Sequence, residues 1–211
     1  GTVTLTQTPV PTFGVYIIKT DSIGDTLWTN IVPDPLTNDV GAISITQTQD
    51  TGYFLSGYVY NSSNFSGDIF IVKTTKFGDT LWTRKIGNGG EGSIGGLQTA
   101  DGGFIIGGAT TSFGAGGQDV FLVKTNNAGI VQWQRTFGGV NNDQPDHIEI
   151  TLDRGFVISG ITSSFGIQNG DLYLIKTDSL GNAPTSIAEP LNTENNISVS
   201  PNPFTASTTI T

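Results

Sequence analysis

The chain has 211 residues, with 18 acidic and 9 basic side chains and a formal net charge of -9 at pH 7. Binding to a phosphate backbone requires clustered Lys and Arg, so this balance argues against a nucleic-acid partner. The sequence has no cysteine, which excludes disulfides and thiol chemistry, and it has no run of about 18 apolar residues of the kind that crosses a membrane as a helix.

A short sequence recurs along the chain. It runs from Lys19 to Trp28, returns from Lys73 to Trp82 and from Lys124 to Trp133, and is present in part from Lys176 to Gly181. A period of roughly fifty residues made of short β-rich segments is typical of propellers and related arrays, in which neighbouring repeats complete each other's core. The 29 glycines, with only 13% charged residues, favour short strands joined by tight turns, so we expect almost no helix.

The clearest unit contains four predicted strands. The first ends at residues 96–99, a turn at 101–103 leads to the second at 104–110, and a polar loop leads to the third at 119–125. A hairpin turn then leads to the fourth, at 130–137. The third strand is apolar at nearly every position, as expected when both faces of a sheet are covered. Each unit therefore predicts a four-stranded antiparallel blade packed between two others.

Counting strands in this way gives about three and a half blades, because the first unit lacks its opening strand and the last lacks a convincing fourth strand. The predicted units are 1–32, 33–86, 87–138 and 139–182. Closed propellers usually have about four to eight blades. The sequence therefore predicts an all-β, β-propeller-like array in the form of an open arc or a fragment of a larger ring, with a four-bladed ring that pools one blade from both termini as the alternative. An arc would expose an apolar blade face at each end.

The turn before the second strand has a recurrent pattern, Asp-x-Gly, which begins at Asp50, Asp101 and Asp153. Glycine in such a turn indicates a backbone with positive φ, and an aspartate side chain can cap the turn by accepting its N–H groups. We interpret these acids as structural.

A lysine and an aspartate also recur on the third strand. The lysines are Lys19, Lys73, Lys124 and Lys176, and the aspartates five residues before the last three are Asp68, Asp119 and Asp171. A buried ammonium needs a carboxylate or carbonyl partner, so one interpretation pairs these aspartates and lysines within or between blades. A lysine that extends its charged end into solvent at the end of the strand is the alternative.

Tryptophan recurs nine residues after the lysine, as Trp28, Trp82 and Trp133, whereas the fourth unit has Thr185 at this position. A large aromatic ring at a fixed position of a repeat favours docking of one blade on the next, burying about 150–250 Å². Stacking against a carbohydrate is the alternative role.

The single histidine, His147, lies close to Asp143 and Asp146 in the sequence. Carboxylate and imidazole groups bind several divalent ions, which makes these three residues candidates for a metal site. The segment is expected to be an inter-blade loop, and the other units do not reproduce the trio. We therefore favour a loop without a metal, and the sequence predicts no cofactor.

The end of the chain has a different composition. Residues 183–196 contain prolines and several asparagines and are predicted to be a linker. Residues 197–211 follow, with the tetrapeptide Pro201, Asn202, Pro203 and Phe204 and a later Thr-Thr-Ile sequence. On composition alone, this tetrapeptide could be an ordinary loop.

The repeat, written D-x-x-x-x-K-T-x-x-x-G-x-x-x-W, resembles the β-propeller-like repeats of large secreted bacterial proteins over residues 1–182. The tail resembles the opening of a type A sorting domain of type IX secretion, in which a similar P-N-P-F segment is followed by a T-T-I strand. The resemblance implies that residues 197–211 are the start of a truncated sorting domain. It also implies recognition by the type IX secretion machinery and a final location outside the cell or on its outer surface.

These patterns together predict an extracellular or cell-surface scaffold without catalytic activity, which binds a surface glycan or a protein. A Ser-His-Asp triad would depend on His147 alone, and two of the four glutamates fall in the predicted linker, so no catalytic arrangement stands out. Two alternatives stay open. One is a propeller-based secreted hydrolase or lyase with its catalytic residues on irregular loops, and the other is a spacer beside a catalytic domain of a longer protein.

Overall fold

The computed structural model describes residues 14–33, 39–61, 66–166, 170–183, 199–200 and 209–210. Within these ranges the protein is all-β, without helices, as the composition predicts; accordingly, no helix there has the length and apolar character needed to cross a membrane. The strands are β1 (Gly14–Thr20), β2 (Thr26–Pro33), β3 (Asp39–Gln47), β4 (Tyr53–Asn61), β5 (Ser66–Thr74), β6 (Thr80–Ile86), β7 (Glu91–Gln98), β8 (Phe104–Thr110), β9 (Asp119–Thr125), β10 (Val131–Phe137), β11 (Asp143–Ile150), β12 (Phe156–Thr162), β13 (Asp171–Thr177), β14 (Val199–Ser200) and β15 (Thr209–Ile210).

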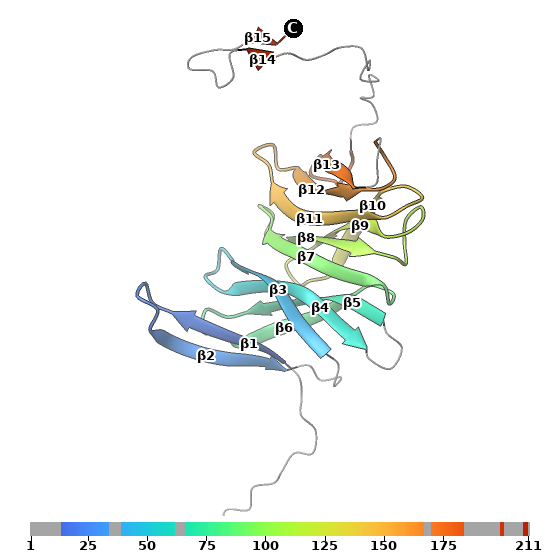
Figure 1. The fold of residues 1–211 in the computed structure, drawn as a ribbon. Coiled ribbons are helices and arrows are strands. Elements are labelled where there is room, and N and C mark those ends of the chain that lie inside the picture. Colours follow the sequence, from blue (N-terminus) through green and yellow to red (C-terminus); the bar gives the residue numbers. More distant parts are fainter. Residues whose placement is uncertain are drawn as a thin grey trace, which may run out of the picture.

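Within each sheet, strands that are consecutive in the sequence pair with one another, and every pair is antiparallel. We call the resulting sheets A (β1-β2), B (β3-β4-β5-β6), C (β7-β8-β9-β10) and D (β11-β12-β13). A separate small ladder joins β14 and β15. Figure 1 shows sheets A to D following one another along the molecule in sequence order. The fold is thus an array of similar sheets rather than a single continuous one.

The hydrophobic core lies between successive sheets. One cluster fills the space between sheets A and B, a second the space between B and C, and a third the space between C and D. In β5, Ile69 and Ile71 belong to the second cluster, whereas Phe70 and Val72 belong to the first. A strand that packs on both faces must be apolar throughout, which explains the continuous apolar run of the third strand.

The turn that follows the third strand is built in the same way in every unit. A side-chain oxygen of its first residue accepts the N–H groups two and four residues further on, and a glycine with positive φ follows three residues after that first residue. The first residues of the four turns are Asp21, Thr75, Asn126 and Asp178.

The prediction for the segment around His147 is wrong. The segment around His147 was expected to be an inter-blade loop, but residues Asp143–Ile150 form strand β11, with a bulge between Pro145 and His147. Among the described strands, β11 pairs only with β12. An edge strand with a bulge tolerates the proline that makes this sequence resemble a loop. The first 13 residues of the predicted first unit and almost all of the predicted linker lie outside the described residues.

Candidate functional site

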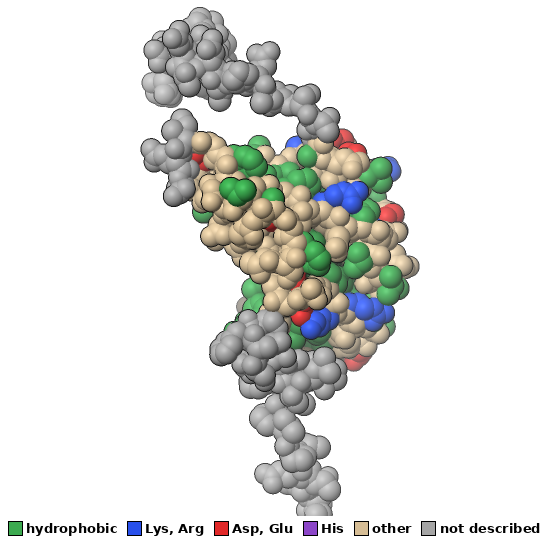
Figure 2. All heavy atoms as spheres, turned by 90° about the vertical axis from the view of Figure 1, so that its right-hand side faces the viewer, with side chains coloured by type: hydrophobic (Ala, Val, Ile, Leu, Met, Phe, Trp, Pro, Cys, Tyr) green, Lys and Arg blue, Asp and Glu red, His purple; other side chains and the backbone are tan. Residues whose placement is uncertain are grey.

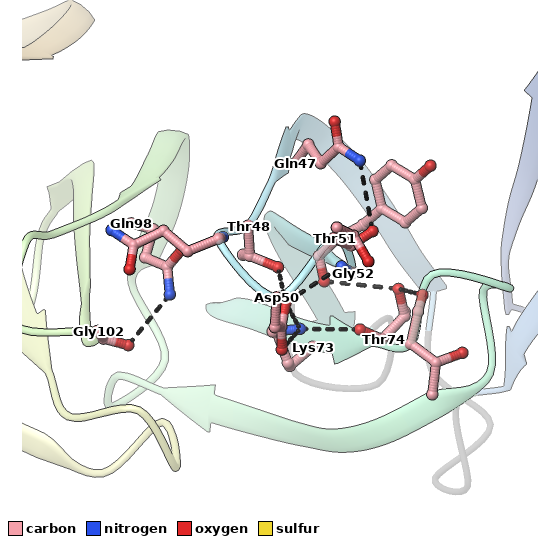
Figure 3. Close-up of polar contacts among 12 residues, drawn as sticks. Gln47, Thr48, Asp50, Thr51, Gly52, Lys73, Thr74, Gln98 and Gly102 are labelled. Atoms are coloured by element: carbon pink, nitrogen blue, oxygen red, sulfur yellow. Dashed lines mark hydrogen bonds and ion pairs between the residues drawn. The ribbon is translucent and has the colours of Figure 1, made fainter.

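The lysine near the end of the third strand is held by the turn that precedes the second strand. In sheet B, Lys73 Nζ lies 2.9 Å from Asp50 Oδ2 and donates to Thr74 O at 2.9 Å. The Asp50 carboxylate also accepts hydrogen bonds from the Thr48 hydroxyl and the Gly52 N–H. Figure 3 shows Asp50 and Thr74 on the ammonium, and Thr48 and Gly52 on the carboxylate. Because Lys73 is only 5% exposed, the carboxylate and the carbonyl replace the water that its charge loses on burial.

The same arrangement, which we call the turn–lysine cluster, occurs in sheets C and D. Lys124 pairs with Asp101 at 2.9 Å, and Lys176 pairs with Asp153 at 2.8 Å. Each of these lysines also donates to the carbonyl of the threonine that follows it. Lys19 differs, because its Nζ lies 5.9 Å from the ring centroid of Tyr53 in sheet B. The described residues therefore contain three turn–lysine clusters for four repeat lysines.

Two features explain the glycines of this turn. Its middle residue has positive φ, at 79° for Gly102, 66° for Thr51 and 64° for Arg154. Its last residue must lack a side chain, because a Cβ on Gly103 would lie 2.2 Å from Thr125 O and 2.5 Å from the lysine Nζ. The turn therefore tolerates variation at the middle position, at some conformational cost, but not at the last.

The aspartates of the third strand do not pair with the repeat lysines, so that prediction is wrong. Asp68 pairs instead with Lys85 at 2.6 Å, and Asp119 accepts the N–H of Ala115 at 2.8 Å. Asp171 holds the same position at the start of β13. Five residues of extended chain span about 16 Å, so the aspartate and the lysine of one strand stand at opposite ends of it.

Hydrogen bonds lower the pKa of the turn aspartates. For Asp50, the hydrogen bond from Thr48 is the largest cause and that from Lys73 adds to it, so that the pKa falls to about 2 despite partial burial. For Asp101, burial raises the pKa, but the hydrogen bonds from Thr99 and the lysine of its cluster outweigh this effect and bring the pKa to about 2. These carboxylates are therefore fully charged at neutral pH.

Each repeat tryptophan packs against the next sheet along the chain. Its ring contacts an aromatic residue at the start of the second strand of that sheet, in the pairs Trp28–Tyr53 (5.9 Å between centroids), Trp82–Phe104 (5.8 Å) and Trp133–Phe156 (6.1 Å). The hairpin glycine of that next unit meets the same ring, since a Cβ on Gly78, Gly129 or Gly181 would lie 2.6, 2.8 or 2.7 Å from the indole. The tryptophans thus lie at the junctions between sheets.

An open groove with a volume of about 540 Å³ lies between sheets C and D. The aromatic residues Trp133 and Phe156 line it together with Gln132, Arg154 and the turn–lysine cluster of sheet C. In that cluster Lys124 donates to Gln132 Oε1 at 3.2 Å as well as to its aspartate. The groove therefore combines aromatic surface with planar polar groups, which is typical of small-molecule sites.

Sequence reasoning missed Arg154, although the sequence carried a signal. Sheet C has Asp-Gly-Gly in this turn, whereas sheet D has Asp-Arg-Gly, with Arg154 at the position of positive φ. A left-handed conformation costs a residue other than glycine about 1–2 kcal/mol. Thr51 has the same conformation in sheet B, and Arg154 differs in that its exposed side chain lines the groove.

The three metal candidates do not form a site. Asp143 is fully buried and accepts hydrogen bonds from Ser164, whereas Asp146 and His147 are exposed. His147 Nε2 lies 3.5 Å from Glu149. Across the described ranges, no group of three or more His, Cys, Asp or Glu side chains is placed to hold a metal ion.

No protein-family model matches this chain, and no curated protein matches it either. The tetrapeptide that resembles a sorting motif, Pro201, Asn202, Pro203 and Phe204, lies outside the described residues.

Proposed function

We propose that this protein is an extracellular or cell-surface scaffold of propeller-type blades, exported by type IX secretion, and that the groove between sheets C and D binds a surface glycan. The observation that carries the binding role is the groove itself, with Trp133, Gln132 and Arg154 in its lining. The other parts of the proposal have separate support.

The packing of the sheets supports the blade interpretation. Each internal sheet is covered on both faces by its neighbours. In addition, the first strands of successive sheets contact one another, β3 with β7 and β7 with β11. First strands meet in this way when four-stranded blades are arranged about a common axis.

The charges in the groove favour an acidic sugar. Lys124 and Asp101 form an ion pair, so their charges offset each other, and Arg154 adds a positive charge to the lining. A guanidinium forms paired hydrogen bonds with a carboxylate. The chain as a whole is acidic, with a formal net charge of -9 at pH 7. On the face shown in Figure 2, the Lys and Arg side chains lie in small separate groups. A sugar carboxylate on Arg154, with its ring beside the aromatic residues, fits this surface.

The test is a glycan array probed with the purified chain and with Arg154→Gly. The glycine restores the residue that sheet C has at this position of positive φ, so the variant should fold at least as stably as the wild type. We expect the chain to bind uronate-containing glycans and Arg154→Gly to bind them at least tenfold more weakly.

The matched control is Thr51→Gly, which makes the same backbone change in sheet B, away from the groove. It should leave binding unchanged. The proposal fails if no glycan binds, or if Arg154→Gly binds as tightly as the wild type.

Export needs its own experiment, because it depends on the resemblance of residues 197–211. The gene that encodes this chain can be expressed in a bacterium that has type IX secretion, with and without the segment that begins at residue 197. We expect the protein to reach the cell surface or the medium only when the segment is present. Equal export of both forms would refute this part.

A further inference from the structure

The third strand of an internal unit carries two half-interfaces on its two faces. In sheet B, Phe70 and Val72 pack toward sheet A, and Ile69 and Ile71 pack toward sheet C. All four side chains are buried. Side chains at alternate positions of this strand therefore pack against the preceding sheet and against the following sheet.

In sheet D the half-interface that would pack against a following sheet is exposed to solvent. Leu172 and Leu174 occupy the positions of Ile69 and Ile71, and they are 82% and 65% exposed. The other half of the same strand is covered, since Ile175 packs in the cluster between sheets C and D. We call the surface formed by Leu172, Leu174 and the neighbouring Ile161 the D face.

In sheet A the opposite half-interface is uncovered. Tyr16 and Ile18 occupy the positions of Phe70 and Val72, and they are 58% and 53% exposed. Ile31, which is 57% exposed, lies beside Tyr16 on the paired strand β2. We call the surface formed by Tyr16, Ile18 and Ile31 the A face.

The hairpin glycine of sheet A gives an independent sign that this half is unfilled. The corresponding glycines of sheets B, C and D each meet the tryptophan of the preceding unit. Gly24, at the same position with φ of 95°, has nothing within 4 Å of where a Cβ would lie. Next to its apolar face, sheet A therefore has an open position where the other sheets contact a tryptophan ring.

We propose that the D face of one copy of this chain docks on the A face of a second copy, head to tail. A second copy is the expected partner because the chain already contains three interfaces of this kind. In each of them, a surface equivalent to the D face of one sheet packs on a surface equivalent to the A face of the next sheet. The residues that define the two faces are apolar, so their contact leaves no charge buried without a partner. Such a contact is heterologous, and it extends the array or closes it into a ring.

The docking is weaker than the internal interfaces for a reason that the sequence gives. The residue nine positions after Lys176 is Thr185, which lies outside the described residues, whereas the three preceding units have tryptophan at this spacing. A second copy therefore has no tryptophan at this spacing to fill the open position at Gly24.

The test is the oligomeric state of the full chain, measured by sedimentation across micromolar to submillimolar concentration. The wild type should form species larger than a monomer as concentration rises. Leu172→Glu with Leu174→Glu blocks the D face, and Tyr16→Glu with Ile18→Glu blocks the A face, so each double variant alone should stay monomeric. Mixed together they should form a one-to-one dimer and nothing larger, because each retains the half that the other lacks.

The matched control is Leu152→Glu, since Leu152 is a fully exposed leucine in a turn away from both faces. It should associate as the wild type does. Circular dichroism and the urea midpoint establish that each variant folds, and Leu174→Thr, which keeps a strand-favouring side chain, replaces any double variant of the D face that does not. A wild type that is monomeric throughout overturns the proposal. Blocked variants that still self-associate, or that do not complement each other, also overturn it.

Discussion

Replacing Gly103 by alanine should test the turn–lysine cluster most directly. The new Cβ would lie 2.2 Å from Thr125 O and 2.5 Å from Lys124 Nζ, and the nearer atom belongs to the backbone. A carbon needs about 1 Å more than this, so either the strand or the ammonium must move. Overpacking costs about 1–3 kcal/mol, and displacing a buried ammonium from its partners costs about 3–5 kcal/mol when complete. We expect a loss of about 2–4 kcal/mol in the free energy of unfolding.

Urea unfolding followed by tryptophan fluorescence measures this loss, and Gly92→Ala is the matched control. A Cβ on Gly92 would have nothing within 4 Å, and its backbone is not in the left-handed region. Alanine at such a site should stabilise the protein by about 0.4–1 kcal/mol, because it restricts the unfolded chain. If Gly103→Ala changed the free energy of unfolding by no more than Gly92→Ala does, the cluster would not have the close-packed geometry described here.

Acid should weaken the fold through Asp50, Asp101 and Asp153, whose pKa values the folded state lowers through hydrogen bonds from Lys, Thr and backbone groups. Their contribution to folding stability is complete above the pKa of an aspartate in the unfolded chain, about 3.9, and is lost as the pH falls toward 2. The urea midpoint should therefore drop between pH 4 and pH 2. A midpoint that stays constant over this range would contradict the assignment. The two members of the cluster in sheet C should not be equivalent. Asp101→Ala leaves the buried ammonium of Lys124 without its carboxylate and should cost about 3 kcal/mol in unfolding free energy, whereas Lys124→Met leaves a carboxylate that is 57% exposed and should cost less than about 1 kcal/mol; equal losses would refute the asymmetry.

Local signals in the sequence predicted most of the secondary structure. The apolar third strand, the Asp-x-Gly turn and the hairpin glycine recur with one period, and the structure repeats the same strand order in sheets B and C. These signals work because each depends on residues close together in the chain. The prediction of all-β structure followed from them without any knowledge of which strands face each other.

The pairing of the lysines could not be predicted in the same way. Lys73 and Asp50 are separated by 23 positions and meet because Phe54, at the start of the second strand, pairs with Lys73 across the β4–β5 ladder. The sequence drew attention to Asp68 because it lies on the same strand as the lysine. Register across a hairpin, rather than spacing along a strand, decides which carboxylate is near.

The candidate groove was missed because its character comes from differences between the units. The turn–lysine cluster fixes the first and last residues of its turn, since one supplies the carboxylate and the other must lack a Cβ. The middle residue is under no such restriction, because at Thr51 and Arg154 its side chain is exposed and only its backbone conformation carries a cost. A repeat that is constrained on both sides of one free position can change its surface there without losing its fold. The position occupied by Thr51, Gly102 and Arg154 is therefore where an array of this kind can acquire a binding specificity, and Arg154 is the member that carries a charge into a groove.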